Sequence, residues 1–215
     1  MDEFTHKTIE VSRGLKYHYT TSPAKQGKPT LLFCHGFPST SSDWSVFATY
    51  FSRRGYGLII PDMLGYGKTD KPTDVNLYIH SAMCRDMIDI LDEESLAQVI
   101  AIGHDWYVRE PLATVNNFIL MLTPALRRGC FTVSRLASWF PERIRAYAFL
   151  CAPYMVPQPG SNIERFMAEV RALVGRDTFG YWYFFAEDDA NDLMQRNVST
   201  CFSLSSCSAE ALLPA

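Results

Sequence analysis

Residues 99–106 read VIAIGHDW, a short apolar run followed by a glycine, a histidine, an aspartate and a tryptophan. An apolar run of this length is typical of a strand that is buried on both faces of a parallel sheet. The sequence at 103–106 matches the start of a nucleophile elbow, a tight strand-to-helix turn that lifts a reactive side chain above the sheet. Asp105 takes the position where such turns often carry serine. We therefore predict a strand over 99–102 that leads into a reactive carboxylate.

The elements on either side of this stretch predict an α/β fold. Buried strands that alternate with amphipathic helices are typical of a mostly parallel sheet with helices on both faces. Ser42 and Asp43 are candidate caps for the first helix. Beyond residue 153 the strand pattern gives way to helical periodicity, which predicts a helical insertion. The other predicted elements are a hairpin at 9–20, strands at 30–34, 58–61 and 147–150, and helices at 42–55, 76–94, 163–174, 178–186 and 188–198.

Composition narrows the class of protein. The chain has 215 residues, 47% of them hydrophobic, and a formal net charge of −3 with both signs scattered along it. The low net charge and high hydrophobic content exclude intrinsic disorder. The charge distribution also has no basic patch of the kind that nucleic-acid-binding proteins carry. Six cysteines without metal-ligand spacing are expected to be buried free thiols in a reducing compartment. The start of the chain is acidic and no apolar run could span a bilayer, so we expect a cytoplasmic protein without a secretory signal.

Three motifs follow predicted strands, at the edge of the sheet where open parallel sheets bind ligands. They read HGFP at 35–38, DMLGYGKTDKP at 62–72 and GHDW at 103–106. The backbone amides of Phe37 and Trp106 are expected to face one developing oxyanion. Asp62, Asp70 and Lys71 of the second motif are expected to order its loop, and His104 is expected to pack rather than to act as a base.

These motifs resemble the soluble epoxide hydrolases of the α/β-hydrolase superfamily. SRLA at 134–137 with FPER at 140–143, and FGYW at 179–182, are similar to the same enzymes. The resemblance implies the α/β-hydrolase fold with the start of a helical cap. It covers residues 9–106 and 129–198.

The resemblance also implies a mechanism. Asp105 would open an epoxide and form an ester, while Tyr181 would donate a hydrogen bond to the epoxide oxygen. Phe37, Pro38 and Trp106 would form the oxyanion turn and contact the substrate. A water molecule activated by a histidine would then release a vicinal diol. The implied substrate is a small apolar epoxide, and no cofactor or metal is implied because a carboxylate, a phenol and an imidazole suffice.

The sequence departs from the family pattern after Trp106. The elbow needs a small residue at position 107, where this chain has tyrosine, and residues 107–128 match nothing in the family. Removing them joins Trp106 to Gly129 and restores the elbow glycine. The codons for residues 106–108 contain a splice-donor-like string, so we hypothesise an intron that is translated in frame. The resulting domain prediction is a core over 1–152 with an atypical insertion at 107–128, a partial helical cap over 153–198 and a non-family tail over 199–215.

A second departure concerns the catalytic base. In this fold the nucleophile comes first in the chain, then the acid, then the histidine. All five histidines of this chain precede Asp105. We therefore expect that the C-terminal part of the fold is missing and that this chain cannot turn over epoxides.

Two other readings of the sequence remain open, and so do the natural substrate and the oligomeric state. One is a non-functional or mispredicted gene product, or a pseudo-enzyme that binds apolar ligands. The other is a haloalkane dehalogenase-like hydrolase. The second is disfavoured because Phe37 offers no side-chain donor to a halide.

Overall fold

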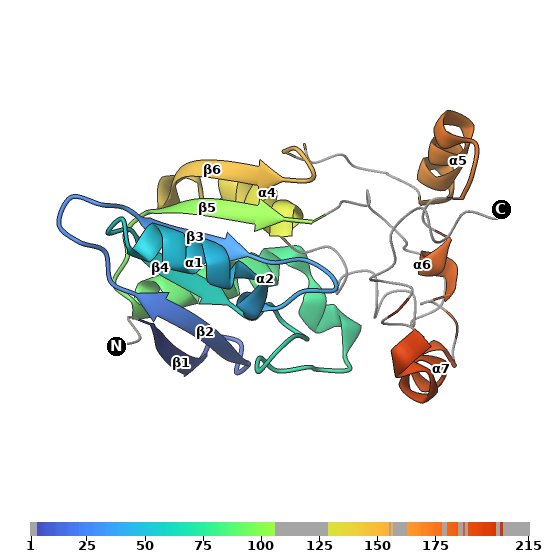
Figure 1. Ribbon diagram of the computed structural model, residues 1–215, viewed down its shortest axis with the longest axis horizontal. Helices are drawn as coiled ribbons and strands as arrows, with labels where there is room; N and C mark the ends of the chain where they lie inside the picture. The colour runs from blue at the N-terminus through green and yellow to red at the C-terminus, as the bar shows by residue number, and fades with distance from the viewer. Residues whose placement is uncertain are drawn as a thin grey trace.

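In the computed structural model, the fold is organised around one mixed sheet that is flanked by helices (Figure 1). Among the described residues, the sheet has the strand order β1-β2-β4-β3-β5-β6. The described residues are 4–105, 129–154, 156, 163–177, 180–184, 187, 189–200 and 203. The strands are β1 (Thr5–Glu10), β2 (Lys16–Ser22), β3 (Thr30–Cys34), β4 (Gly57–Pro61), β5 (Val99–His104) and β6 (Ile144–Leu150).

Strand directions agree with the prediction of a mostly parallel sheet that opens with a hairpin. The pairs β3–β4, β3–β5 and β5–β6 are parallel, whereas β1–β2 and β2–β4 are antiparallel. Gly14 lies in the turn between β1 and β2 with a φ of 74°, a conformation that glycine adopts without steric cost. Because β3, β4 and β5 are parallel, the three predicted motifs all follow strand ends at the same edge of the sheet.

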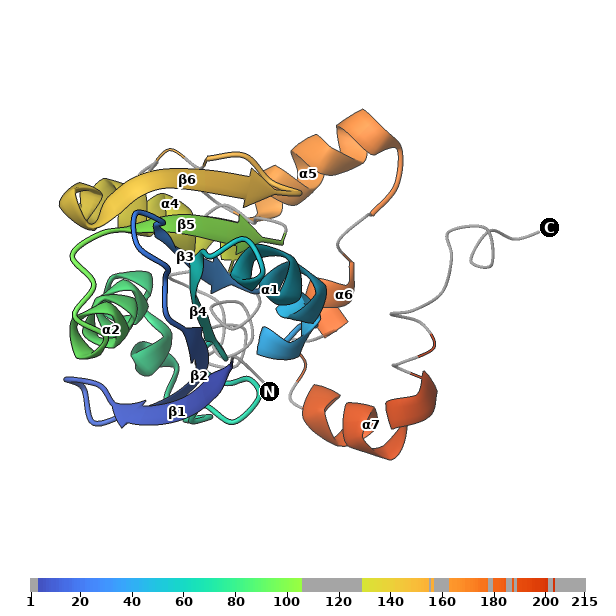
Figure 2. The same ribbon diagram turned by 60° about the vertical axis from the view of Figure 1, so that its left-hand side comes forward.

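Helices cover both faces of the sheet, as predicted (Figure 2). Side chains alternate along β3, so that Leu31 and Phe33 belong to one apolar cluster and Leu32 and Cys34 to the other. The first cluster includes Ala48 from α1, and the second is formed with α2 and α4. The helices of the core are α1 (Ser45–Ser52), α2 (His80–Glu93) and α4 (Gly129–Trp139), with 3-10 turns η1 (Ser41–Trp44), η2 (Val75–Tyr78) and η3 (Pro141–Arg143).

The start of the first helix differs from its predicted caps. Thr40, not Ser42 or Asp43, is the N-cap of the 3-10 turn η1, and Trp44 is the N-cap of α1, which follows that turn directly. The backbone N–H of Thr40 donates to Asp43 Oδ2 at 3.0 Å. Asp43 therefore closes the helix start from inside the first turn, as the acidic partner of a capping box does.

Strand β6 is placed as predicted, but its burial is not. The apolar run at 147–150 predicts a strand covered on both sides, whereas Tyr147 is 54% exposed. Within the described part of the chain, β6 pairs with β5 alone and forms the edge of the sheet. An edge strand of this kind presents unpaired backbone groups to solvent.

Within the described residues, helices α5 (Ile163–Val174), α6 (Tyr181–Phe184) and α7 (Ala190–Arg196) follow β6 and lie beyond the carboxyl ends of β3, β5 and β6 (Figure 1). The helical pattern predicted after residue 153 is thus confirmed, while the division into a core and a cap stays a prediction. The insertion at 107–128 and most of the tail at 199–215 lie outside the described residues.

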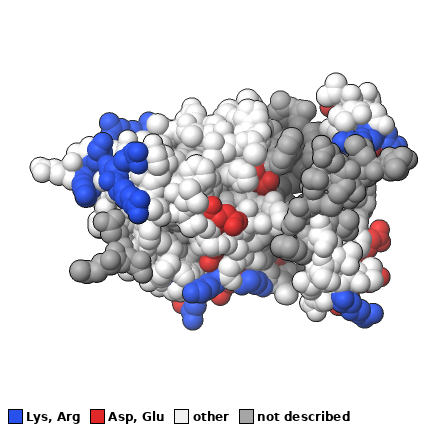
Figure 3. Space-filling model, in the orientation of Figure 1, with Lys and Arg blue, Asp and Glu red and all other residues white. Residues whose placement is uncertain are grey.

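Charge on the surface is mixed. Figure 3 shows basic and acidic side chains in small separate groups across the visible face. None of the helices in the described ranges combines the length and apolar character that a bilayer crossing would need.

A buried ion pair joins the opening hairpin to α2. The Arg13 guanidinium donates from Nε to Asp86 Oδ1 at 2.8 Å and pairs with the second carboxylate oxygen through Nη2. The hydroxyl of Tyr17 donates to the same carboxylate at 2.8 Å. Asp86 is 0% exposed, and its hydrogen bond raises the pKa of Arg13 even though partial burial opposes that shift. The carboxylate therefore satisfies two groups from β2 and the turn before it.

Replacing Asp86 by alanine is expected to lower the free energy of unfolding by about 3–5 kcal/mol, because a cation and a hydroxyl would lose their buried partner. Asp92→Ala on the same helix provides the matched control. Asp92 pairs with Arg143 at 2.7 Å, but its side chain is 49% exposed, so we expect a loss below about 1 kcal/mol. Urea unfolding followed by circular dichroism measures both values. Equal losses in the two variants would contradict the prediction.

Candidate active site

The end of β5 holds Asp105 in a strained backbone conformation. Its φ is 115°, a value that residues with side chains rarely adopt, and the residue is only 8% exposed. Such strain costs roughly 1–3 kcal/mol and persists where the surrounding structure enforces it, most often at functional sites. The strained backbone at Asp105 is consistent with the turn predicted from GHDW, which itself stays a prediction because the residues after Asp105 lie outside the described ones.

The turn after β3 meets Asp105 directly. The backbone N–H of Phe37 donates to Asp105 Oδ2 at 2.6 Å. Gly36 makes this approach possible, because a Cβ atom at that position would overlap the Asp105 side chain. The peptide bond between Phe37 and Pro38 is cis. Two of the predicted motifs, far apart in the sequence, thus form one site.

His35 ties the same turn to the loop after β4. Its Nδ1 donates to the carbonyl of Gly36 at 2.9 Å, and its Nε2 accepts from the Met63 backbone N–H at 2.9 Å. One ring nitrogen therefore carries the proton and the other is an acceptor, which is the neutral form of the ring. Sequence reasoning assigned His35 no role, although a polar residue directly after a buried strand is a signal that could have found one.

The loop over 62–72 is held by its own acidic side chains, as predicted. Asp62 accepts the backbone amide of Ser41 at 3.0 Å and that of Lys68 at 2.9 Å. Burial would raise the pKa of Asp62, but these hydrogen bonds outweigh it and the pKa is lowered. Asp70 accepts the backbone amide of Lys16 at 2.8 Å. These carboxylates order the loop that flanks the site.

The helix behind the elbow begins at Gly129. A Cβ atom at this position would overlap the backbone of His104 and the carbonyl of Cys34. Gly103 is equally crowded, with the backbone of Gly129 against it. The thiol of Cys130 donates to the Gly103 carbonyl at 3.2 Å. Strand and helix can approach this closely only because both contact positions are glycine, which is the packing that a nucleophile elbow requires.

The structure supports the roles of the remaining predicted site residues less directly. Tyr181 is the first residue of α6, is 45% exposed and belongs to the helices beyond the carboxyl ends of the strands. Trp106 lies outside the described residues. His104 packs edge-on against Trp44, with ring centroids 6.1 Å apart, in agreement with its predicted packing role. The catalytic roles of Tyr181 and Trp106 stay predictions.

Comparisons with known proteins agree with this geometry. A family model described as alpha/beta hydrolase fold matches residues 29–106. An epoxide hydrolase of Caballeronia sordidicola is 37% identical over 170 residues, and the match covers 76% of this chain and 45% of that protein. Bifunctional epoxide hydrolase 2 of Mus musculus is 25% identical over 202 residues, which are 94% of this chain and 31% of that protein. This chain therefore spans less than half the length of these two curated relatives.

Solved structures extend the likeness to the fold. The crystal structure of epoxide hydrolase VrEH1 from Vigna radiata has a TM-score of 0.71 and 28% sequence identity to this chain. The superposition covers 96% of this chain and 56% of that one. The sheet and the helices that flank it therefore share their arrangement with that structure.

Proposed function

Because this chain belongs to the epoxide hydrolase family of α/β-hydrolase-fold proteins, we propose that Asp105 opens a small apolar epoxide. One carboxylate oxygen attacks a ring carbon from behind the carbon–oxygen bond, which breaks as the new bond forms. The ring oxygen leaves as an alkoxide and takes a proton from a phenol, for which we propose Tyr181. The product of this step is a hydroxyalkyl ester of Asp105.

The observation that carries the proposal is the hydrogen bond from the Phe37 amide to Asp105 Oδ2. An aspartate is ordinarily ionised at pH 7, so it needs no base to attack an sp³ carbon. The Phe37 amide binds the carboxylate and fixes its position at the end of β5. When water later attacks the ester, the amides of Phe37 and Trp106 would bind the oxygen that becomes negative.

Hydrolysis of the ester needs a base, and we propose that this 215-residue chain stops at the ester. Water must lose a proton as it adds to the ester carbonyl, after which the diol leaves and the carboxylate is restored. The family's histidine would accept that proton, but no histidine of this chain follows Asp105. We therefore propose a single covalent event rather than turnover.

Trapping the ester tests the proposal. The chain is incubated with a radiolabelled aryl epoxide, and the intact protein is expected to gain the mass of one epoxide. Peptide mapping is expected to place the label on Asp105. Label spread over several carboxylates or thiols, or no label at all, would overturn the assignment.

A dehalogenase-like activity is the second candidate, and the same trap separates the two. A haloalkane would also leave an ester on Asp105, with one equivalent of halide released. Phe37 has an apolar side chain where a halide would need a donor, so we expect no halide above background. If halide were released as fast as the epoxide is trapped, the epoxide assignment would fail. If neither substrate leaves an adduct, the pseudo-enzyme hypothesis gains.

Gly36→Ala is expected to slow ester formation by about 10²–10³-fold, because the new Cβ displaces Asp105 from the Phe37 amide. Gly14→Ala is the control. Its Cβ meets nothing within 4 Å, but its φ of 74° should lower stability by about 1 kcal/mol. Rates of labelling and thermal unfolding are compared for both variants. A normal labelling rate in the Gly36 variant would contradict the prediction.

We also propose that residues 107–128 are dispensable. The support is that Gly129 packs against the backbone of His104. The helix that begins at Gly129 is therefore already close to the end of β5, as it would have to be if Gly129 followed Trp106 directly. A variant without residues 107–128 is expected to fold with an unchanged strand content, measured by circular dichroism, and to be labelled at Asp105. Loss of folding on deletion would refute the proposal.

We propose a cytoplasmic location, supported by the thiols. In the part of the chain that the structure describes, Cys34, Cys84 and Cys130 are free and buried as predicted, whereas Cys151 is free but exposed because it follows the edge strand β6. Free buried thiols suit a reducing compartment. A fluorescent fusion that localised to the secretory pathway would contradict this.

A further inference from the structure

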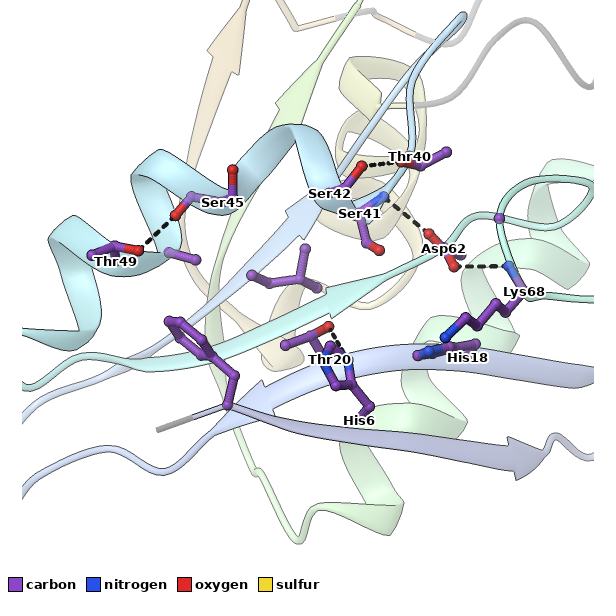
Figure 4. A pocket seen from close by; sticks show the side chains of 14 residues that line it. His6, His18, Thr20, Thr40, Ser41, Ser42, Ser45, Thr49, Asp62 and Lys68 are labelled. Carbon is purple, nitrogen blue, oxygen red and sulfur yellow. Dashed lines mark hydrogen bonds between the residues drawn. The ribbon is translucent and has the colours of Figure 1, made fainter. Parts of the chain in front are cut away.

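A cavity lies near the edge of the sheet opposite β6 (Figure 4). It is enclosed by β1, β2 and β4 on one side and by η1 and α1 on the other. Its volume is about 420 Å³, and neither Phe37 nor Asp105 lines it. This cavity is called the hairpin pocket below. It is lined by Phe4, His6, His18, Thr20, Thr40, Ser41, Ser42, Ser45, Ala48, Thr49, Ile60, Asp62, Gly67 and Lys68.

His18 brings an unsatisfied polar group to this pocket. The residue is 7% exposed, and within the described residues its Nδ1 is buried without a hydrogen-bond partner. Buried polar atoms in folded proteins are nearly always paired, so an exception needs a physical reason. In Figure 4 the side chain of Lys68 ends over the His18 ring. His18 and Lys68 both line the cavity, and Lys68 lies close enough to the ring to act on it electrostatically.

The acidic residue of the pocket does not supply the missing partner. The two oxygens of Asp62 accept the backbone amides of Ser41 and Lys68 at 3.0 Å and 2.9 Å. A Cβ atom on Gly67 would overlap the Asp62 side chain, so the carboxylate is enclosed by its own loop. Asp62 is the acidic residue among the described residues that line the pocket, and its carboxylate is already engaged by its own loop.

Further polar groups lie beside this pair, and one part of the wall is apolar. His6 packs edge-on against His18, with ring centroids 5.6 Å apart, and its Nδ1 is 3.0 Å from the hydroxyl of Thr20. Phe4 and Ile60 contribute hydrocarbon surface, and Ile60 belongs to the buried apolar cluster around α1. An occupant that satisfies both parts has an anionic acceptor at one end and a short hydrocarbon body at the other.

We propose that the hairpin pocket binds a small organic carboxylate, with its oxygens between Lys68 and His18 and its hydrocarbon part against Phe4 and Ile60. The oxyanion accepts from the Lys68 ammonium and from an imidazole N–H. Charge-assisted hydrogen bonds of this kind are stronger than those between neutral groups. This site is separate from the one at Asp105 and does not depend on the epoxide chemistry.

The electrostatics of His18 supply a readout. Burial is the main cause that lowers its pKa, Lys68 and His6 lower it further, and Asp62 acts in the opposite direction. A bound carboxylate adds negative charge beside the ring and therefore raises that pKa. Binding should consequently strengthen as the pH falls through the range in which His18 takes up a proton.

The test is an NMR titration of the imidazole signals of the full chain with sodium butyrate, compared with butyramide and inorganic phosphate. Butyrate is expected to saturate the His18 signals and to raise the His18 pKa. Butyramide, which has the same shape without the charge, is expected to leave both unchanged. Phosphate, which lacks the hydrocarbon part, is expected to bind at least about tenfold more weakly. Equal responses to butyrate and butyramide would overturn the proposal, as would phosphate binding as tight as that of butyrate.

Variants locate the site. Lys68→Gln is expected to weaken butyrate binding about ten- to hundredfold, the worth of one charge-assisted hydrogen bond. Lys25→Gln is the matched control, because Lys25 is exposed and does not line the pocket. Its affinity for butyrate is expected to stay within about twofold of the original. Equal weakening in both variants would show a general charge effect and refute the site, and circular dichroism confirms that each variant is folded.

Discussion

Replacement of Asp105 by asparagine is expected to slow ester formation by at least about 10⁴-fold, the scale seen when a group that forms the covalent intermediate is removed. The amide has nearly the same shape and can still accept the Phe37 N–H, so the turn should keep its geometry. What it loses is the negative charge on the attacking oxygen. The measurement is the rate at which a labelled aryl epoxide becomes attached to the protein.

Asp43→Asn is the matched control for this replacement. Asp43 is an exposed carboxylate in the segment that follows the oxyanion turn, and it accepts the Thr40 amide at 3.0 Å. The same chemical change there is expected to leave the labelling rate within about twofold. Persistent labelling of the Asp105 variant at its original rate would show that another group reacts with the epoxide, and the proposed nucleophile would be wrong.

The second prediction concerns turnover by the 215-residue chain. We expect one equivalent of epoxide to be consumed and steady diol formation to be at least about 10⁴-fold slower than in a relative with a complete catalytic triad. The reason is that the structure gives the existing histidines other tasks. His35 uses both ring nitrogens, and His104 packs on Trp44. His6 and His18 line the hairpin pocket, and the His80 ring packs on Phe131.

Added imidazole distinguishes a missing base from a damaged site. If the ester is formed but lacks a base, imidazole in solution should accelerate diol release in proportion to its concentration. N-ethylmorpholine, a bulkier base of similar strength, is the control for general buffer catalysis. Several turnovers per chain without any added base would contradict the prediction, and so would an ester that imidazole leaves intact.

Much of the fold could be predicted because its strands are apolar runs with clear ends. The strand at 30–34 has the predicted bounds, and the helix at 163–174 does as well. The wrong predictions concern features that depend on contacts with neighbouring segments. The exposure of Tyr147 depends on what covers an edge strand, and the start of α1 depends on a 3-10 turn that local preference does not distinguish from a helix.

The candidate site shows the same division. The residue types of HGFP and GHDW point to an oxyanion turn and a carboxylate nucleophile, because the chemistry needs those groups. Their meeting does not follow from spacing, since Phe37 and Asp105 are 68 residues apart along the chain. The hairpin pocket was not predicted at all, because His18 and Lys68 belong to no common motif and come together only through the packing of β2 against the loop after β4.

The sequence by itself determined the class of fold and the order of its main elements, because periodicity and residue type are local properties, and for the same reason it could single out Asp105 as the candidate nucleophile. The tertiary structure alone decided that the Phe37 amide contacts Asp105, that Gly129 packs against the backbone of His104, and that His35 is held as a neutral ring. These outcomes depend on contacts between distant segments, and such contacts form only when the parallel strands bring their carboxyl ends to one edge of the sheet.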